Sequence, residues 1–280
     1  QMSVRRVMLF LQNYGLSPNL ATKIAKYYGE SAVELIRQNP YRLVTDIDGV
    51  GFLTADRIAL SMGVDPHSEF RVRSALYYLL SEAAVGGGHT YLPKSVLAQG
   101  AVRMLHVEDE LVENQITQAL LTKMIVAFRL PDQEENCLCL PFYFQAESEI
   151  AERLHYLMEA RPYKKVTGLP ERIAALEKEL ELSLSARQRQ AVQSAVEEGV
   201  LIITGGPGTG KTTIIRCILK LLKDDNDILL CAPTGRAAKR MTEATGEDAK
   251  TIHRMLEYGG EENVFARDEN YPLETDCLIV

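Results

Sequence analysis

One short stretch constrains the fold of this chain more than any other. "VLIITGGPGTGKTT" (200–213) has the pattern G-x-x-x-x-G-K-[ST] between a β-branched run and a helix-forming run. Glycines tolerate positive φ, so this backbone can turn several N–H groups towards one phosphate, and the helix that follows adds its positive end. The stretch therefore predicts a strand, a phosphate-binding loop and a helix. A glycine-rich turn that binds no ligand is the alternative.

The side chains of this loop predict a nucleoside triphosphate bound together with Mg²⁺. Lys211 is expected to reach the β and γ phosphates and is the candidate catalytic residue, while the Thr212 hydroxyl is the expected Mg²⁺ ligand. The residues expected to bind the nucleotide are Gly205, Gly206, Pro207, Gly208, Thr209, Gly210, Lys211, Thr212 and Thr213.

Strand-like and helix-like runs alternate around the loop, from about residue 183 onwards. The expected strands are "VLIIT", "DILLCA" and "CLIV", and the expected helices are "KTTIIRCILKLLK" and "GRAAKRMTEAT". This alternation is typical of a parallel sheet with helices on its faces. Residues 183–280 are therefore predicted to form an α/β P-loop domain.

Residues 1–65 have no strand signal and contain an internal repeat. "YGLSPNLATKIAKYYG" and "IDGVGFLTADRIALSMG" each hold an apolar residue, a glycine-bearing turn and an amphipathic helix closed by glycine. The turns contain Gly15 in the first copy and Gly49 and Gly51 in the second, and Gly29 and Gly63 are expected helix caps. The repeat predicts an all-α region of helical hairpins. Hairpins that only pack against their neighbours are the alternative.

Residues 66–145 predict a small winged-helix-like α+β module. "FRVRSALYYLLSEAAV" reads as a helix stopped by the glycines at 86–88; helices from Ser95 and around "EDELVENQITQALLTK" follow, then two β-rich runs, "MIVAFRL" and "CLCLPFYF". Cys137 and Cys139 alternate, which predicts one strand face, with a metal pair as the alternative. Residues 146–182, with a break at "RPYKKVTGLP", predict connecting helices.

Composition limits the class of protein. A chain of 280 residues, 46% hydrophobic and 25% charged, is typical of globular protein with about two domains. Its net charge of −7 argues against a generally basic nucleic-acid coat but leaves local phosphate sites open. Five scattered cysteines fit a reducing cytosol. No apolar stretch approaches the roughly 18 residues of a membrane span, and no signal-peptide cleavage site is evident. We therefore expect a cytoplasmic location and no membrane partner.

Three flanking segments select among the many kinds of P-loop protein. "LSARQRQAV" lies upstream of the loop, and "APTGRAAKRM" and "TIHRML" lie downstream. Together with the loop, they resemble the successive motifs of superfamily 1 DNA helicases of the RecD-like (RecD/TraA) type. "IDGVGFLTADRIA" resembles the helix-hairpin-helix motif, which implies that Gly49 and Gly51 present backbone amides to a DNA phosphate. The implied fold is mixed: an all-α helix-hairpin-helix region, a winged-helix-like module and an incomplete RecA-like motor domain at 183–280.

The resemblance also implies roles for residues near the loop. Gln188 would match the glutamine that reads adenine, and an amide side chain does offer a donor and an acceptor to N7 and the exocyclic amine. Thr234, Gly235 and Arg236 would match the segment that touches single-stranded DNA. His253 would lie in a later motif to which no role is assigned.

The implied activity is that of an ATP-dependent DNA helicase with 5′ to 3′ polarity. It would use ATP and Mg²⁺ and act on single-stranded DNA and DNA junctions, with protein partners unknown. An acidic pair that holds Mg²⁺ and orients water is expected directly after a buried strand. Asp276 comes before the strand "CLIV" and so cannot belong to this pair. The pair is therefore expected to begin at the position that follows Val280. The chain is therefore expected to stop within the motor domain and not to hydrolyse ATP alone. Another P-loop ATPase or kinase, or a non-catalytic DNA-binding module, is the alternative.

Overall fold

Two compact units make up the chain in the computed structural model. They span Gln1–Ile150 and Ala151–Val280. The structure describes residues 7–11, 14–131, 134–259 and 264–280. The opening residues, the two positions ahead of the first repeat's turn and part of the polar link between the two β-rich runs lie outside the described residues. Among the described helices, none is both long and apolar enough to cross a membrane.

Both predicted hairpin repeats contain their expected helices. The helices of this region are α2 (Pro18–Tyr28), the 3₁₀ turn η1 (Gly29–Ser31), α3 (Ala32–Gln38), α4 (Arg42–Asp46) and α5 (Phe52–Ser61). Ser17 caps α2 by accepting a backbone hydrogen bond at 3.4 Å, and Gly29, with φ of 59°, ends it. Gly63, with φ of 83°, follows α5 in a Schellman motif, in which Val64 N donates to Ala59 O at 3.0 Å. Both predicted glycine caps are confirmed.

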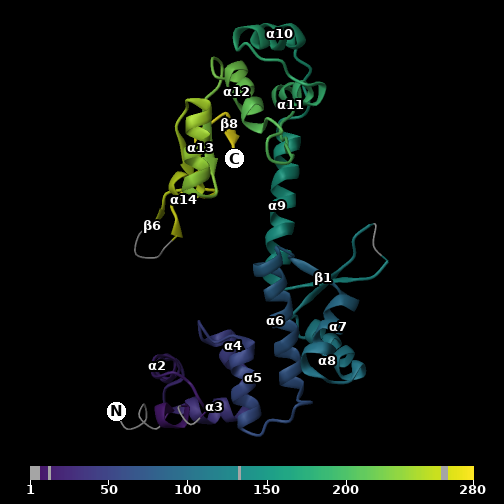
Figure 1. Ribbon diagram of the computed structural model, residues 1–280, viewed down its shortest axis with the longest axis vertical. Helices are drawn as coiled ribbons and strands as arrows, with labels where there is room; N and C mark the ends of the chain where they lie inside the picture. The colour runs from purple at the N-terminus through teal and green to yellow at the C-terminus, as the bar shows by residue number, and fades with distance from the viewer. Residues whose placement is uncertain (1–6, 12–13, 132–133, 260–263) are drawn as a thin grey trace. The chain divides into compact units, whose positions relative to one another are not determined.

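A helical cluster and a small antiparallel sheet form the rest of unit 1. Their elements are α6 (Glu69–Gly87), β1 (Tyr91–Pro93), α7 (Lys94–Leu105), α8 (Asp109–Leu121), β2 (Val126–Phe128) and β3 (Cys137–Cys139). The strands lie in the order β1–β3–β2, with Leu138 of β3 opposite both Leu92 and Ala127. Figure 1 shows α7 and α8 beside α6, against which both pack. This combination of helices and sheet matches the predicted α+β module. The sequence predicts only two strands here, because β1, with three residues, is too short to show an alternating pattern.

The second β-rich run is only half strand, which corrects the sequence prediction. The buried residues of β3 belong to the sheet, but "PFYF" opens the helix α9 (Pro141–Ala160). Proline holds φ near the helical value and lacks the N–H that a central strand needs, so Pro141 favours the start of a helix. The predicted break is present, because residues 161–168 form neither helix nor strand before α10 (Leu169–Glu179).

A buried ion pair joins the second hairpin repeat to the helices that follow it. The Arg71 side chain is 9% exposed and holds Asp56 through Nε–Oδ1 at 2.8 Å and Nη2–Oδ2 at 3.1 Å. Arg71 also donates to the carbonyl of Leu105 at 3.1 Å, and the Tyr41 hydroxyl donates to Asp56 at 2.7 Å. Burial, together with this bond to Asp56, raises the pKa of Tyr41. The bidentate pair therefore fixes α5, α6 and α7 in one arrangement.

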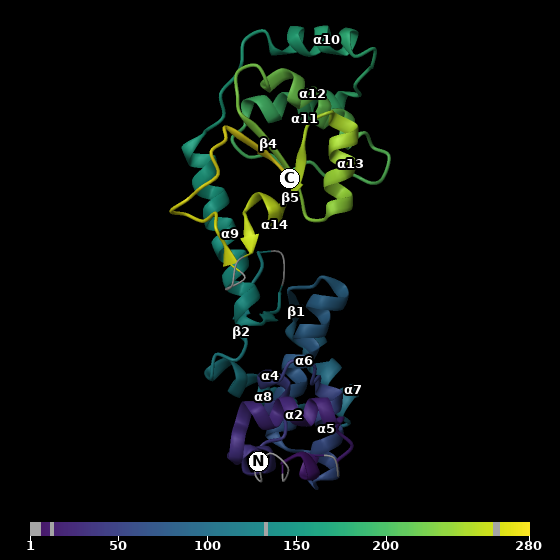
Figure 2. The ribbon, with the colours of Figure 1, turned by 90° about the vertical axis from the view of Figure 1, so that its left-hand side faces the viewer.

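A three-stranded parallel sheet with flanking helices organises unit 2. Its further elements are α11 (Ala186–Glu197), α12 (Lys211–Leu222), β4 (Ile228–Ala232), α13 (Gly235–Thr245), β5 (Ala249–Thr251), α14 (Ile252–Met255), β6 (Tyr258–Gly259), β7 (Val264–Phe265) and β8 (Cys277–Ile279). β4 is central, with Leu230 opposite Ala249 of β5 and Ile228 opposite Cys277 of β8. Figure 2 shows β4 and β5 side by side with α13 along them. The predicted parallel sheet and its "DILLCA" strand are confirmed.

The predicted strand before the phosphate loop is not formed, which is a second correction. Residues 201–206 have no regular secondary structure, and Ile202 is 75% exposed. A strand needs a hydrogen-bonded neighbour, and both edges of the central β4 are already taken by β5 and β8. Ile203 nevertheless packs against the core of unit 2, which α10, α11 and α12 share. Within this run, Ile203 therefore ties the start of the loop to the core by packing, without strand pairing.

Candidate nucleotide-binding site

The loop at 205–210 has the glycine geometry that its sequence predicts. Gly208 and Gly210 have φ of 76° and 82°, values that side chains rarely adopt, and Gly210 is the cap of α12. A Cβ on Gly205 would lie 2.7 Å from the Thr209 hydroxyl oxygen, so a side chain at that position would displace Thr209. Since α12 begins directly at Lys211, its unpaired amides and positive end face the loop. The backbone here can surround an anion.

The Lys211 ammonium lies within the turn of its own loop. Its Nζ donates to the carbonyl oxygens of Gly205 at 2.6 Å and of Gly206 at 2.9 Å, and the Thr209 hydroxyl donates to Gly206 O at 2.9 Å. These carbonyls hold the cation only with neutral acceptors. Phosphate oxygens are stronger acceptors for an ammonium group because they are charged. Lys211 is thus placed to exchange loop carbonyls for phosphate oxygens with a small movement of its side chain.

Gln188 is joined to the loop although it lies on a different helix. Its Oε1 accepts from Ser185 N at 2.8 Å and its backbone N donates to the Ser185 hydroxyl, which completes a capping box at the start of α11. Its Nε2 donates to the carbonyl of Thr209 at 3.0 Å. A primary amide has two donors and two acceptor sites, so one N–H and one lone pair of Gln188 still have capacity for a nucleotide base.

The hydroxyls of Thr212 and Thr213 lie in the first turn of α12. Thr212 is exposed and Thr213 is half-buried. Mg²⁺ takes one or two protein ligands together with phosphate oxygens and keeps several waters, so a single exposed hydroxyl here fits that ion. Elsewhere in the described part of the chain, no cluster of three or more acidic, histidine or cysteine side chains is suited to a metal. Cys139 belongs to the cysteine pair for which a metal was the alternative. Burial raises the pKa of its thiol to about 11, so the thiol stays protonated at neutral pH.

Thr234, Gly235 and Arg236 form a second exposed turn at the carboxyl end of β4. Thr234 is the cap of α13, and its hydroxyl accepts from Ala237 N at 3.2 Å. Gly235 and Arg236 form the first turn of the helix, where amides lack intrahelical partners. Asp276, in contrast, lies at the amino end of β8, where its Oδ2 accepts from Asp227 N at 2.8 Å. Because β8 runs parallel to β4 and begins at Cys277, Asp276 lies at the opposite edge of the sheet from Thr234.

The turn that holds Gly49 and Gly51 is well defined in unit 1. Gly49 has φ of 94°, and a Cβ on either glycine would meet no atom within 4 Å. The apolar side chains between and around them are buried, Val50 among them. Lys23 of α2 donates to the carbonyl of Asp48 at 3.4 Å, so a cation of the first repeat lies beside this turn. The exposed backbone and the nearby cation suit a phosphate.

Two features of unit 2 were not foreseen from the sequence. The first is an aromatic cluster. His253 packs edge-on to Tyr258, with ring centroids 5.3 Å apart, and Tyr258 lies 4.8 Å from Phe265 on the paired strands β6 and β7.

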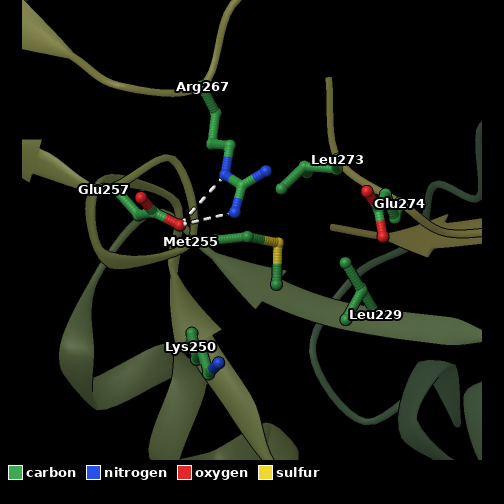
Figure 3. A pocket seen from close by; sticks show the side chains of 7 residues that line it. All are labelled: Leu229, Lys250, Met255, Glu257, Arg267, Leu273 and Glu274. Carbon is green, nitrogen blue, oxygen red and sulfur yellow. Dashed lines mark hydrogen bonds and ion pairs between the residues drawn. The ribbon is translucent and has the colours of Figure 1, made fainter. Parts of the chain in front are cut away.

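The second feature is a cavity, shown in Figure 3, in which Arg267 donates twice to one oxygen of Glu257 at 2.9 Å. The cavity of about 250 Å³ is lined by Leu229, Lys250, Met255, Glu257, Arg267, Leu273 and Glu274. None of these residues belongs to the phosphate loop. They come from several separate segments between Leu229 and Glu274, so no short sequence motif indicates the cavity.

Comparison with known proteins places these features in a class. Residues 1–91 match the family described as "ATP-dependent RecD2 DNA helicase HHH domain", and residues 188–280 match an AAA domain. The chain therefore combines a helix-hairpin-helix region with an ATPase-type region that contains both Gln188 and the phosphate loop.

Individual relatives identify the family within that class. The ATP-dependent RecD2 DNA helicase of Deinococcus radiodurans is 31% identical over 284 residues, which cover 99% of this chain and 39% of that protein. The RecBCD enzyme subunit RecD of Mycolicibacterium smegmatis is 34% identical over 43% of this chain and 25% of its own length. The chain is a RecD-like helicase sequence with an N-terminal helix-hairpin-helix domain, and it spans about two fifths of the length of the Deinococcus helicase.

Proposed function

We propose that this chain forms the DNA-engaging front and the nucleotide-binding part of an ATP-dependent DNA helicase. The helicase moves 5′ to 3′ along single-stranded DNA and unwinds duplex, with DNA junctions as substrates and the cytoplasm as its location. The observation that carries this proposal is the convergence of Gln188 and Lys211 on the same loop, from two different helices. One end of this arrangement suits a base and the other suits phosphates.

The residues of the loop divide the binding of ATP between them. The amides at 205–210 and the start of α12 bind the β and γ phosphates, and Lys211 neutralises the charge that develops on the γ phosphate. Mg²⁺, held through Thr212, supplies further neutralisation of that charge. Gln188 reads adenine with its remaining N–H and lone pair. These are binding and charge-stabilising roles, and orienting the attacking water needs a further polar group.

DNA contacts are proposed at two separate exposed turns. Gly49 and Gly51 present backbone amides to a phosphate without reading sequence, with Lys23 adding charge. The first turn of α13, with Thr234, Gly235 and Arg236, binds the backbone of a single strand. We assign the phosphate contact at Gly49 and Gly51 to the helical-hairpin region at 1–65, and the single-strand contact to the motor domain at 183–280. Residues 66–145 form the winged-helix-like module between them, and residues 146–182 form the connecting helices.

The motor function is tested by Lys211→Ala in the full-length helicase. DNA-stimulated ATP hydrolysis and unwinding should fall by about a hundredfold or more, because one charge-stabilising group is removed, whereas nucleotide-free binding to single-stranded DNA should persist. Lys220→Ala is the matched control, since Lys220 lies on the same helix and forms an exposed ion pair with Glu179. Unwinding that persists in Lys211→Ala contradicts the assignment of the loop. Tight ATP binding without any DNA binding favours a small-molecule kinase.

The 280-residue polypeptide should itself turn over little ATP. Its described carboxylates nearest to β8 precede that strand, at Glu274 and Asp276, so neither follows the strand's carboxyl end. A steady-state phosphate-release assay with and without single-stranded DNA measures this directly. Turnover that DNA stimulates to the level of the full-length helicase overturns the expectation.

A further inference from the structure

An ion pair behind the nucleotide-binding site has no part in the roles assigned so far. Glu177 near the end of α10 faces Arg189 on α11, with the Arg189 Nη2 2.9 Å from Oε2 and 3.0 Å from Oε1. The Glu177 side chain is only 12% exposed, and its Oε1 also accepts from Leu184 N at 2.7 Å. The Leu184 bond, then the Arg189 guanidinium, keep the pKa of Glu177 below its ordinary value. A covered carboxylate with a bidentate partner and a backbone donor is a firm anchor.

The two groups that Glu177 holds lie on both sides of the helix turn that carries Gln188. Leu184 precedes the cap residue Ser185, and Arg189 directly follows Gln188. Within that turn, the Ser185 and Gln188 side chains complete the capping box, and Gln188 Nε2 reaches the carbonyl of Thr209. Hydrogen bonds, together with the peptide bonds that join Leu184 to Ser185 and Gln188 to Arg189, therefore connect Glu177 to the phosphate loop.

We propose that Glu177 and Arg189 are positioning residues for Gln188 and so set the preference of this site for adenine. The proposal rests on the ATP-binding function above and deepens it. Neither residue needs to touch the nucleotide. A glutamine discriminates between purines only if its amide is held in one orientation, because a rotated amide offers a donor where adenine needs an acceptor. The phosphate contacts depend on the loop backbone and Lys211, so they are independent of this anchor.

The test compares Glu177→Gln with the wild-type 280-residue chain in binding to ATP, GTP and inorganic tripolyphosphate, each with Mg²⁺. Gln can still accept from Leu184 N but removes the charge that holds Arg189. We expect the ratio of ATP to GTP affinity to fall about tenfold while tripolyphosphate affinity is unchanged. Glu179→Gln is the matched control, because Glu179 lies on the same helix and its pair with Lys220 is 60% and 54% exposed. Its ratio should equal that of the wild type.

Three outcomes oppose the proposal or the function beneath it. An unchanged ATP to GTP ratio in Glu177→Gln overturns the positioning role, and so does a parallel loss of tripolyphosphate affinity, which indicates general loosening. Absence of ATP binding by the wild-type chain opposes the proposed function instead. If Glu177→Gln does not fold, as judged by circular dichroism, Arg189→Lys replaces it, because lysine keeps the charge but loses the fork. The same fall in the ratio is then expected.

Discussion

The hairpin turn at 47–51 and the phosphate loop at 205–210 are both glycine turns at a helix start, yet they are supported differently. In the hairpin turn, Ile47, Val50 and Phe52 are all buried, so apolar side chains hold the backbone from within. Ahead of the phosphate loop, Leu201 and Ile202 are exposed and Ile203 packs against the core, while the polar contacts of Lys211 and Gln188 hold the turn itself. A turn held by a core presents one fixed surface, which suits a constant phosphate backbone. A turn held by exchangeable polar contacts can release them to a ligand.

The largest expected effect comes from removing the buried ion pair between Arg71 and Asp56, which holds α5, the helix that follows the hairpin turn. Arg71→Met leaves the Asp56 carboxylate buried without its partner, and such losses cost about 3 kcal/mol of unfolding free energy or more. Denaturant unfolding of the 280-residue chain measures it. Arg73→Met is the control two residues along α6, where the partner Glu69 is largely exposed. Equal stability of the two variants contradicts the anchoring role of the buried pair.

A second substitution breaks the polar support of the phosphate loop. Gly210→Ala forces an alanine to φ of 82° and places its Cβ 2.5 Å from Gln188 Nε2. The free loop relaxes away from this strained conformation, and restoring it on binding costs about 3 kcal/mol, which is roughly a hundredfold in ATP affinity measured by calorimetry. Gly208→Ala suffers strain without a clash, since a Cβ there meets open space. Its loss should be nearer tenfold, and equal losses in both variants show that strain alone decides.

A third pair of substitutions sharpens the comparison at the hairpin turn. Gly49→Val places a β-branched residue at φ of 94°, and DNA affinity should fall about tenfold while basal ATP hydrolysis in the full-length helicase is unchanged. Gly51→Val keeps an ordinary φ but adds bulk to the amide surface. Fluorescence anisotropy with single-stranded and junction DNA measures both. Unchanged affinity in both variants favours a hairpin that serves packing alone.

The smallest expected effect concerns pH. The pKa of Glu177 is lowered in the folded chain, so its contribution to stability is complete above its ordinary value of 4.5 and is lost as pH falls through the lower folded value. The difference in melting temperature between wild type and Glu177→Gln should therefore be present at pH 7 and disappear in more acidic buffer. A difference that grows on acidification contradicts the ion pair. Melting curves at several pH values decide between these outcomes.

Most of the site was predictable because its residues are consecutive. The loop, the helix that begins at Gly235 and the glycine caps at Gly29 and Gly63 each depend on a few neighbouring residues whose φ preferences and hydrogen-bonding groups are local. The resemblance predicts an adenine-reading role for Gln188, whereas its bond to Thr209 depends on the packing of α11 against α12. The strand predictions for "VLIIT" and "PFYF" are wrong for different reasons. "VLIIT" has no free strand edge to pair with, because β5 and β8 occupy both edges of β4. "PFYF" begins a helix, because Pro141 favours a helix start.

By itself, the sequence determined the phosphate loop, the two glycine hairpins, the parallel α/β pattern and the RecD-like relationship. Tertiary structure alone decided which strands pair, and it brought together the groups that Arg71 and Glu177 join. The physical reason is range. Backbone conformation at a glycine or a cap depends on atoms within a few residues, whereas strand pairing and buried ion pairs depend on which distant surfaces the cores bring into contact.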